Sequence, residues 1–140
     1  MVSTKEMIEE ISKMQYHLVA CAPTPAQYAV QKVFPDRMKF IDELLPVFDR
    51  RRRLMTNLLN NIEGFECPMP QGAFYTFPRF SMNMSSKDLA RSIVSAGVIC
   101  SPGIAFGDRG ERHMRFSYAA SEENIKDGME IIERVVNGIT

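Results

Sequence analysis

The sequence predicts an α+β fold in which helices lie over a small, mostly antiparallel sheet, with a helical segment in front of it. Apolar residues recur at the spacing of helices through residues 3–61. Short apolar or alternating stretches bounded by turn residues follow up to residue 118, which is typical of strands. Helical spacing then returns near the end of the chain. A chain of 140 residues is long enough to bury one hydrophobic core.

Two short helices are predicted at the start of the chain. In residues 3–20 the spacing of Ser3 and Glu6 matches a capping box, in which each side chain bonds the other's backbone N–H. A second helix is predicted over residues 26–34, with Pro25 at its beginning, where the missing N–H does no harm. The apolar face of the first helix is expected to consist of Met7, Ile8, Ile11, Met14 and Leu18.

A long helix is predicted over residues 36–61. Pro46 lies inside it and removes one backbone hydrogen bond, so either a kink or two abutting helices are expected there. Gly64 stands where a helix commonly ends. The positions expected to be buried are Met38, Ile41, Leu44, Leu45, Phe48, Leu54, Leu58 and Leu59.

The second half predicts the order strand, strand, helix, strand, strand, helix. Ser85 or Ser86 is the expected N-cap of the first of these helices and Ser121 of the second, while Gly97 and Gly138 follow their ends. The elements are expected at residues 65–67, 73–77, 86–96, 98–100, 113–118 and 121–138, with a Gly-rich loop at residues 101–112. The two helices are expected to bury Leu89, Ile93 and Val94, and Ile125, Met129, Ile132, Val135 and Val136.

Charge and hydropathy argue against nucleic-acid and membrane partners. The formal net charge is zero, so nothing global favours an anionic partner. The four arginines at residues 50–53 would spread around a helix at about 100° per residue. Asp42, Glu43 and Asp49 can pair with them. No apolar run approaches the roughly 20 residues that span a bilayer.

Cysteine usage and the N-terminal residues indicate a cytoplasmic protein without a metal centre. Cys21, Cys67 and Cys100 are odd in number and far apart, which suggests neither a zinc site nor a disulfide framework. Reduced thiols are usual in the cytoplasm. The polar residues 1–6 lack the apolar core of a signal peptide. No metal ligand is therefore assigned.

The strand predicted at residues 113–118 carries Arg115 on its polar face. Successive side chains of a strand point to opposite faces. A guanidinium is a planar fork that matches a carboxylate with two parallel hydrogen bonds. A substrate carboxylate, an internal Asp or Glu, and solvent remain open as partners of Arg115. The two faces are Met114, Phe116 and Tyr118 toward the core, and His113, Arg115 and Ser117 away from it.

Several motifs occur in the order and spacing of one enzyme family. Residues 115–119 match R-x-S-x-A, and residues 70–75 match a proline followed by G-A-F-Y or G-T-F-Y. Residues 98–107 match V-x-x-x-P-G-x-x-F-G. A double arginine within residues 50–53 and Gln-x-Ala at residues 27–29 also fit. In these features the chain resembles, over essentially its whole length, the C-terminal part of the fold-type I pyridoxal-phosphate-dependent aminotransferases of the aspartate aminotransferase-like group.

The resemblance implies a role for Arg115 and a division of the chain. In the family, the arginine of R-x-S-x-A grips the α-carboxylate of the amino-acid substrate, so Arg115 is the implied substrate-binding residue. Tyr75 and Gly72 are implied neighbours of the same pocket. Residues 1–35 would be a helical remnant of the large domain at the dimer interface, and residues 36–140 would be the small domain. The implied partners are an L-amino acid, a 2-oxo acid and a second copy in a homodimer.

The cofactor-binding lysine of this family has no counterpart in the sequence. The family places that lysine in S-x-S-K, followed by a segment like G-x-R-x-G. Lys5 follows Ser3 and Thr4, but E-M-I-E-E comes after it. Pyridoxal phosphate is thus implied for the complete enzyme and is not expected on this chain alone. No catalytic, cofactor-binding or metal-binding residue is assigned.

Enzymatic activity of the chain on its own is left open, with inactivity expected. Two alternatives accompany the aminotransferase interpretation. One is a non-catalytic interaction module that dimerises through its N-terminal helices, derived from an aminotransferase. The other is part of a lyase or synthase of the same superfamily.

Overall fold

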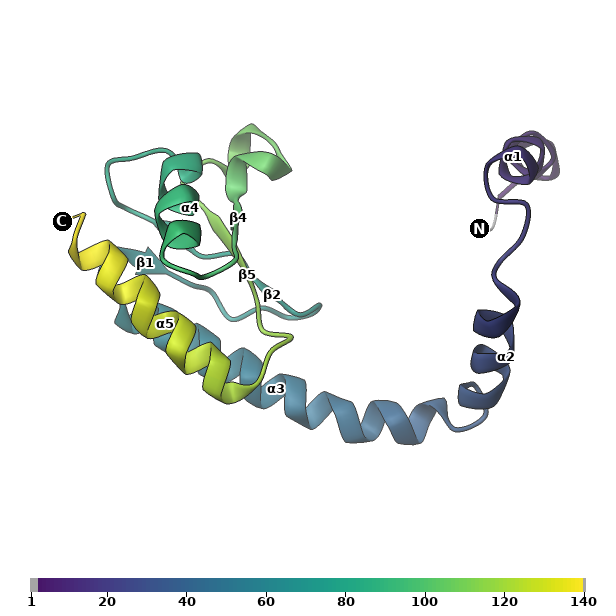
Figure 1. The fold of residues 1–140 in the computed structure, drawn as a ribbon, viewed down its shortest axis with the longest axis horizontal. Coiled ribbons are helices and arrows are strands. Elements are labelled where there is room, and N and C mark those ends of the chain that lie inside the picture. The colour runs from purple at the N-terminus through teal and green to yellow at the C-terminus, as the bar shows by residue number, and fades with distance from the viewer. Residues whose placement is uncertain (1–2, 140) are drawn as a thin grey trace. The chain divides into compact units, whose positions relative to one another are not determined.

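A computed structural model describes residues 3–139 of the chain. The chain divides into two compact units, one up to Asp42 and one from Glu43 onward, and the division falls inside the third helix. Figure 1 draws both units and labels their α-helices and most of their strands. The assignment of residues 1–35 and 36–140 to a large and a small domain stays a prediction.

The first unit contains helices α1 (Lys5–Leu18) and α2 (Thr24–Val33). Thr4 caps α1, because its hydroxyl accepts a hydrogen bond from Met7 N at 3.4 Å. The predicted capping box at Ser3 is wrong, since the helix begins after Thr4. Ser3 Oγ lies 3.0 Å from the Met7 sulfur instead.

Most apolar side chains of α1 and α2 are exposed. Only Ile8 and Ile11 of the predicted α1 face are half-buried. Four residues predicted to be buried in the next helix are also exposed: Met38, Ile41, Leu44 and Leu45. The predicted burial of these four is wrong because the part of that helix that packs on the core begins at Phe48.

The third helix, α3, spans Arg37–Asn61 without a break. Pro46 lies inside it, so the predicted alternative of two abutting helices is wrong. Pro46 is exposed, so solvent can satisfy the carbonyl that the proline leaves unpaired. The C-terminal part of the helix buries Met55 and Leu59 in the core. No helix within residues 3–139 is long and apolar enough to cross a membrane.

Short strands of the second unit form two antiparallel sheets (Figure 1). The strands are β1 (Phe65–Glu66), β2 (Tyr75–Thr76), β3 (Arg79–Phe80), β4 (Ser101–Pro102) and β5 (Met114–Ser117). Strand β5 lies between β2 and β4, and β1 pairs with β3. A bridge between Arg79 and His113 connects β3 to the start of β5.

The strand pattern differs from the prediction at two places. The sequence did not predict β3, and the strand predicted at residues 98–100 is absent. Pairing begins instead at Ser101, so β4 lies inside the predicted loop of residues 101–112. That loop also holds the 3₁₀ helices η1 (Gly103–Phe106) and η2 (Asp108–Gly110). Two-residue strands are too short for a periodic signal, and only their distant partners define them.

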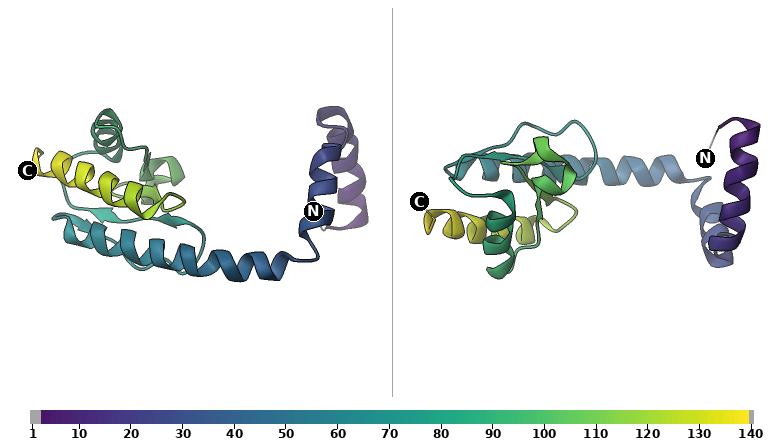
Figure 2. Two further views of the ribbon diagram at one scale, coloured as in Figure 1. Left: turned by 60° about the horizontal axis from the view of Figure 1, so that its bottom comes forward. Right: turned by 90° about the horizontal axis from the view of Figure 1, so that it is seen from above.

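Helices α4 (Ser86–Ser95) and α5 (Glu122–Asn137) begin at predicted caps. Ser85 and Ser121 each accept a backbone N–H at 3.1 Å. Val94, predicted to be buried, is 48% exposed. Helix α5 runs alongside the C-terminal half of α3 (Figure 2). With α4 and the sheets they enclose one core, whose largest fully buried members include Leu59, Phe80, Leu89, Ile93, Met114, Tyr118, Ile132 and Val136.

Candidate functional site

Arg115 lies on the middle strand of the three-stranded sheet, on the face away from the core. Met114, Phe116 and Tyr118 are at most 2% exposed. Arg115 is half-buried and Ser117 is exposed. The alternation predicted for this strand is therefore confirmed. Because β5 is the middle strand, side chains from β2 and from the segment that follows β4 can reach Arg115 from its two sides.

Two aromatic rings and one hydroxyl hold the Arg115 guanidinium. Its Cζ lies 4.4 Å from the ring centroid of Tyr75, on β2, and 4.6 Å from that of Phe106, in η1. Both distances are within the range of cation–π interactions. Arg115 Nη2 also donates to Ser101 Oγ at 3.2 Å. A guanidinium has five N–H donors, so this arrangement leaves donors for a further partner.

Arg115 forms no ion pair with a carboxylate of residues 3–139. Four other arginines do form such pairs: Arg50, Arg52, Arg53 and Arg91. The internal Asp or Glu that the sequence left open for Arg115 is thus not found within the described part of the chain. Partial burial of a charge without a counter-ion is unfavourable. Arg115 is therefore suited to accept an external carboxylate through two parallel hydrogen bonds.

Partly exposed aromatic side chains continue the surface beside Arg115. Phe77 meets Phe106 edge-to-face, with ring centroids 5.8 Å apart. Phe77 also stacks on the His113 ring at 5.0 Å, with planes 7° apart. Phe106 is 51% exposed and Phe77 is 37% exposed. The sequence singled out neither phenylalanine as a neighbour of Arg115, although Phe106 lies within the matched P-G-x-x-F-G pattern.

The two residues predicted to accompany Arg115 lie in different surroundings. Tyr75 contacts the guanidinium directly. Gly72 lies in an open depression of about 260 Å³, which Arg52 and Tyr118 also line. A Cβ at Gly72 would meet open space, and the backbone there does not need glycine. A substrate-binding role for Gly72 stays a prediction.

A carboxylate network fixes the segment that carries Phe106. Glu111 accepts hydrogen bonds from Ser86 N at 2.6 Å and from Ser86 Oγ at 3.0 Å. Ser86 Oγ in turn accepts from Ile104 N at 3.4 Å. The bond from the Ser86 N–H chiefly holds the pKa of the Glu111 carboxyl below its usual value. Because Ile104 belongs to η1, the network ties Phe106 to the start of α4.

Three of the four arginines at residues 50–53 pair with carboxylates, and the fourth, Arg51, lies over the ring of Phe48. Arg53 Nε donates to Asp49 Oδ2 at 2.9 Å, and Arg52 also pairs with Asp49. Hydrogen bonds from Arg53 and then Arg52 hold the pKa of Asp49 below its usual value. Arg50 Nε lies 3.4 Å from a carboxylate oxygen of Glu122 on α5. Pairing with Asp49 agrees with the prediction, whereas Glu122 is a tertiary partner that the sequence did not indicate.

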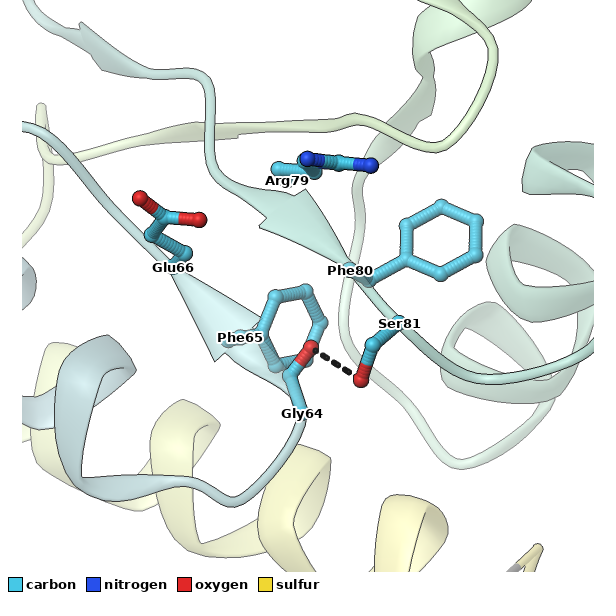
Figure 3. A pocket seen from close by; sticks show the side chains of 6 residues that line it. All are labelled: Gly64, Phe65, Glu66, Arg79, Phe80 and Ser81. Carbon is cyan, nitrogen blue, oxygen red and sulfur yellow. Dashed lines mark hydrogen bonds between the residues drawn. The ribbon is translucent and has the colours of Figure 1, made fainter.

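An open groove of about 360 Å³ lies beside the two-stranded sheet (Figure 3). It is lined by Gly64, Phe65, Glu66, Arg79, Phe80 and Ser81. Ser81 Oγ donates to Gly64 O at 3.4 Å. Glu66 and Arg79 are opposite one another in the strand register. This groove therefore carries a negative and a positive side chain opposite one another. The Arg115 site instead presents a cation.

The surroundings of the lysines within residues 3–139 do not fit pyridoxal phosphate. A Schiff-base lysine needs a neighbouring pocket for the cofactor ring and its phosphate. All lysine side chains of the chain are exposed. Lys126 lines a groove together with Glu130 and Glu133, whose charges would repel a phosphate. Within residues 3–139, no cluster of His, Cys, Asp or Glu is arranged to hold a metal ion.

Comparisons with known proteins agree with the motifs around Arg115. Residues 1–132 match the family described as aminotransferase class I and II. The chain belongs to this family. It is 38% identical over 138 residues to a (5-formylfuran-3-yl)methyl phosphate transaminase of Methanocaldococcus jannaschii, covering 97% of this chain and 36% of that protein. It is 34% identical over 130 residues to a probable aspartate aminotransferase of the same organism, covering 93% of this chain and 34% of that protein.

Solved structures of aminotransferases share the fold. An aromatic aminotransferase from Pyrococcus horikoshii superimposes with a TM-score of 0.88 and 35% identity, covering 98% of this chain and 38% of that chain. An aspartate aminotransferase from Thermus thermophilus gives a TM-score of 0.83 at 28% identity, covering 95% and 35%. The predicted α+β class and the family resemblance are confirmed. The chain spans about a third of the length of these relatives and corresponds to their C-terminal portion.

Proposed function

We propose that this chain is part of a pyridoxal-phosphate aminotransferase, which moves an amino group between an L-amino acid and a 2-oxo acid. In this proposal Arg115 binds the α-carboxylate of the substrate. The observation that supports it most is the half-buried guanidinium, which Tyr75 and Phe106 hold in place without a carboxylate partner among residues 3–139.

A carboxylate site suits both halves of such a reaction. The amino-acid donor and the 2-oxo-acid acceptor differ at the carbon that carries nitrogen or oxygen, but both keep the α-carboxylate. One fixed arginine can therefore position either compound. Two parallel hydrogen bonds from Arg115 would fix the orientation of the carboxylate, and with it the adjacent reacting carbon. Tyr75 would border the same pocket.

Pyridoxal phosphate, which membership of the family implies, supplies the electron sink for amino transfer when it is bound. No lysine of this chain fits its Schiff base, so we propose that the chain alone is inactive and contributes substrate positioning to a complete enzyme. A homodimer in the cytoplasm is part of the same proposal. The relatives reported above carry transaminase names, which favours transamination over lyase or synthase chemistry.

Binding of a 2-oxo acid to the chain tests the role of Arg115. In a nuclear magnetic resonance titration with pyruvate, amide shifts should gather around Arg115, Ser101 and Tyr75. Hydrogen bonds to charged groups contribute about 1.5–3 kcal/mol, so Arg115→Gln should weaken binding by roughly tenfold or more. Arg91→Gln is the matched control, because Arg91 is exposed on α4 and pairs with Asp88.

Two results would contradict the proposal. One is pyruvate affinity that Arg115→Gln leaves unchanged. The other is a set of shifts confined to residues away from β2, β4 and β5. Absorbance showing that the isolated chain forms a stoichiometric Schiff base with pyridoxal phosphate would contradict its proposed inactivity.

A non-catalytic dimerising module is a second candidate function. It is favoured by large apolar side chains of α2 and the start of α3 that are at least 55% exposed: Tyr28, Val30, Val33, Met38 and Phe40. Exposed apolar patches mark association surfaces. Sedimentation should then show a dimer, and a monodisperse monomer would count against this role.

A further inference from the structure

The surroundings of Arg115 determine what can lie beside a bound carboxylate. Tyr75 and Phe106 cover the guanidinium, so a carboxylate must approach the free N–H groups at its edge. Phe77 extends this surface through its edge-to-face contact with Phe106. Both phenylalanine rings remain partly exposed. The neighbourhood of the cation is therefore aromatic, and part of it is available to a ligand.

We propose that this site selects carboxylates that carry an aromatic group, with Phe106 and Phe77 as specificity-determining residues. The inference rests on the proposed binding of carboxylate by Arg115. Phe106 lies 4.6 Å from the guanidinium carbon. Aromatic rings interact favourably at centroid separations of roughly 4.5–7 Å. In this proposal, two methylene groups carry a phenyl ring from a carboxylate on Arg115 to Phe106.

The same surface disfavours a second carboxylate. Within residues 3–139, the cation that lies on Phe106 is Arg115, and Phe77 contacts Phe106 and His113. No second arginine or lysine of these residues has a described contact with either ring. The other ring on Phe77 belongs to His113, whose Nδ1 lies 3.1 Å from Glu111 O. The second charge of a dicarboxylate would thus be placed against apolar rings, where it loses hydration without gaining a counter-ion.

Three probe carboxylates separate the preference for an aromatic group from the exclusion of a second charge: 3-phenylpropanoate, propanoate and succinate. Each is titrated into the 140-residue chain, and binding is followed by nuclear magnetic resonance. An aromatic pair contributes enough to make 3-phenylpropanoate bind about two- to tenfold more tightly than propanoate. Phe106→Leu and Phe77→Leu should each reduce this ratio toward one. Phe77→Leu should leave propanoate affinity unchanged, whereas Phe106→Leu also removes a cation–π contact of Arg115 and should weaken the binding of both ligands. Phe40→Leu is the control, because Phe40 is also an exposed phenylalanine, at 57%, but lies in the first unit.

The outcomes distinguish this inference from the proposed function. Equal affinities for the three carboxylates, tighter binding of succinate, or a preference that survives in both leucine variants would overturn the aromatic selectivity alone. Absence of carboxylate binding to the unmodified chain, or binding unaffected by Arg115→Gln, would overturn the proposed role of Arg115 and the selectivity with it. Unchanged amide spectra away from the site would establish that the variants remain folded.

Discussion

Replacing Tyr118 by phenylalanine should loosen the turn that leads into β2. Tyr118 is 1% exposed, and its hydroxyl donates to Ala73 O at 2.9 Å. Ala73 has a φ of 59°, in the left-handed region that is unfavourable for alanine. The backbone N–H of Tyr118 donates to Phe74 O at 3.0 Å. Tyr118 thus holds a strained turn two residues before Tyr75, which contacts Arg115.

The expected cost of Tyr118→Phe is about 1 kcal/mol in the free energy of unfolding. The change removes one neutral hydrogen bond and leaves the ring in place, and such bonds contribute about 0.5–1.5 kcal/mol. Ala73 is exposed, so water can replace the lost donor and prevent a larger loss. In a domain of roughly 60–100 residues this corresponds to a fall in Tm of about 4–8 °C.

The variant should also respond differently to alkaline pH. Burial raises the pKa of Tyr118 above its ordinary value, because the folded state favours the neutral phenol. This contribution to stability is present below the ordinary tyrosine pKa and is lost as pH rises through the raised pKa. Stability of the unmodified chain should therefore fall more steeply in alkali than that of Tyr118→Phe.

Urea unfolding followed by circular dichroism measures both effects, and hydrogen exchange at Tyr75 reports the turn. Tyr28→Phe is the matched control, because Tyr28 is 67% exposed. The reasoning would be refuted if Tyr118→Phe cost no more than Tyr28→Phe, or if both showed the same alkaline slope as the unmodified chain.

Two further predictions concern the support of η1. Gly103→Ala should cost at least about 3 kcal/mol, since its Cβ would lie 2.0 Å from Gly110 O. Gly72→Ala, with open space around its Cβ, should stay within about 0.5 kcal/mol, and equal Tm values for the two variants would contradict this. The pKa of Glu111 is lowered in the folded chain, so the ionised carboxylate stabilises the fold. This stabilisation is present above the ordinary carboxyl pKa and is lost as pH falls through the lowered pKa. Glu111→Gln should therefore be less acid-sensitive in urea unfolding than the unmodified chain, and an identical acid slope would argue against the Ser86 network.

Local sequence signals were sufficient for the helices of the second unit and for the face that carries Arg115. Ser85 and Ser121 act as caps on residues three positions further along the chain. The alternation of β5 likewise depends on neighbouring residues only. Such features could be read from spacing, because the atoms that determine them are close in sequence. The motifs that identify the family are likewise short stretches of neighbouring residues, so they could also be recognised in the sequence.

Burial could be predicted less well than helix position. Leu44 and Val94 have the apolar character and spacing of core residues, yet both are exposed. Helical periodicity identifies an apolar face, but the neighbouring element determines which part of that face is covered. In α3 the core begins near Phe48, which the sequence of the helix does not mark.

By itself, the sequence determined the family, the positions of the capped helices and the arginine on the polar face of β5. Only the tertiary structure decided what surrounds that arginine. Tyr75, Ser101 and Phe106 reach Arg115 because β5 pairs with β2 on one side and β4 on the other. The register between short strands far apart in the chain depends on their mutual hydrogen bonds and on the common core beneath them. No spacing within a single segment carries that information.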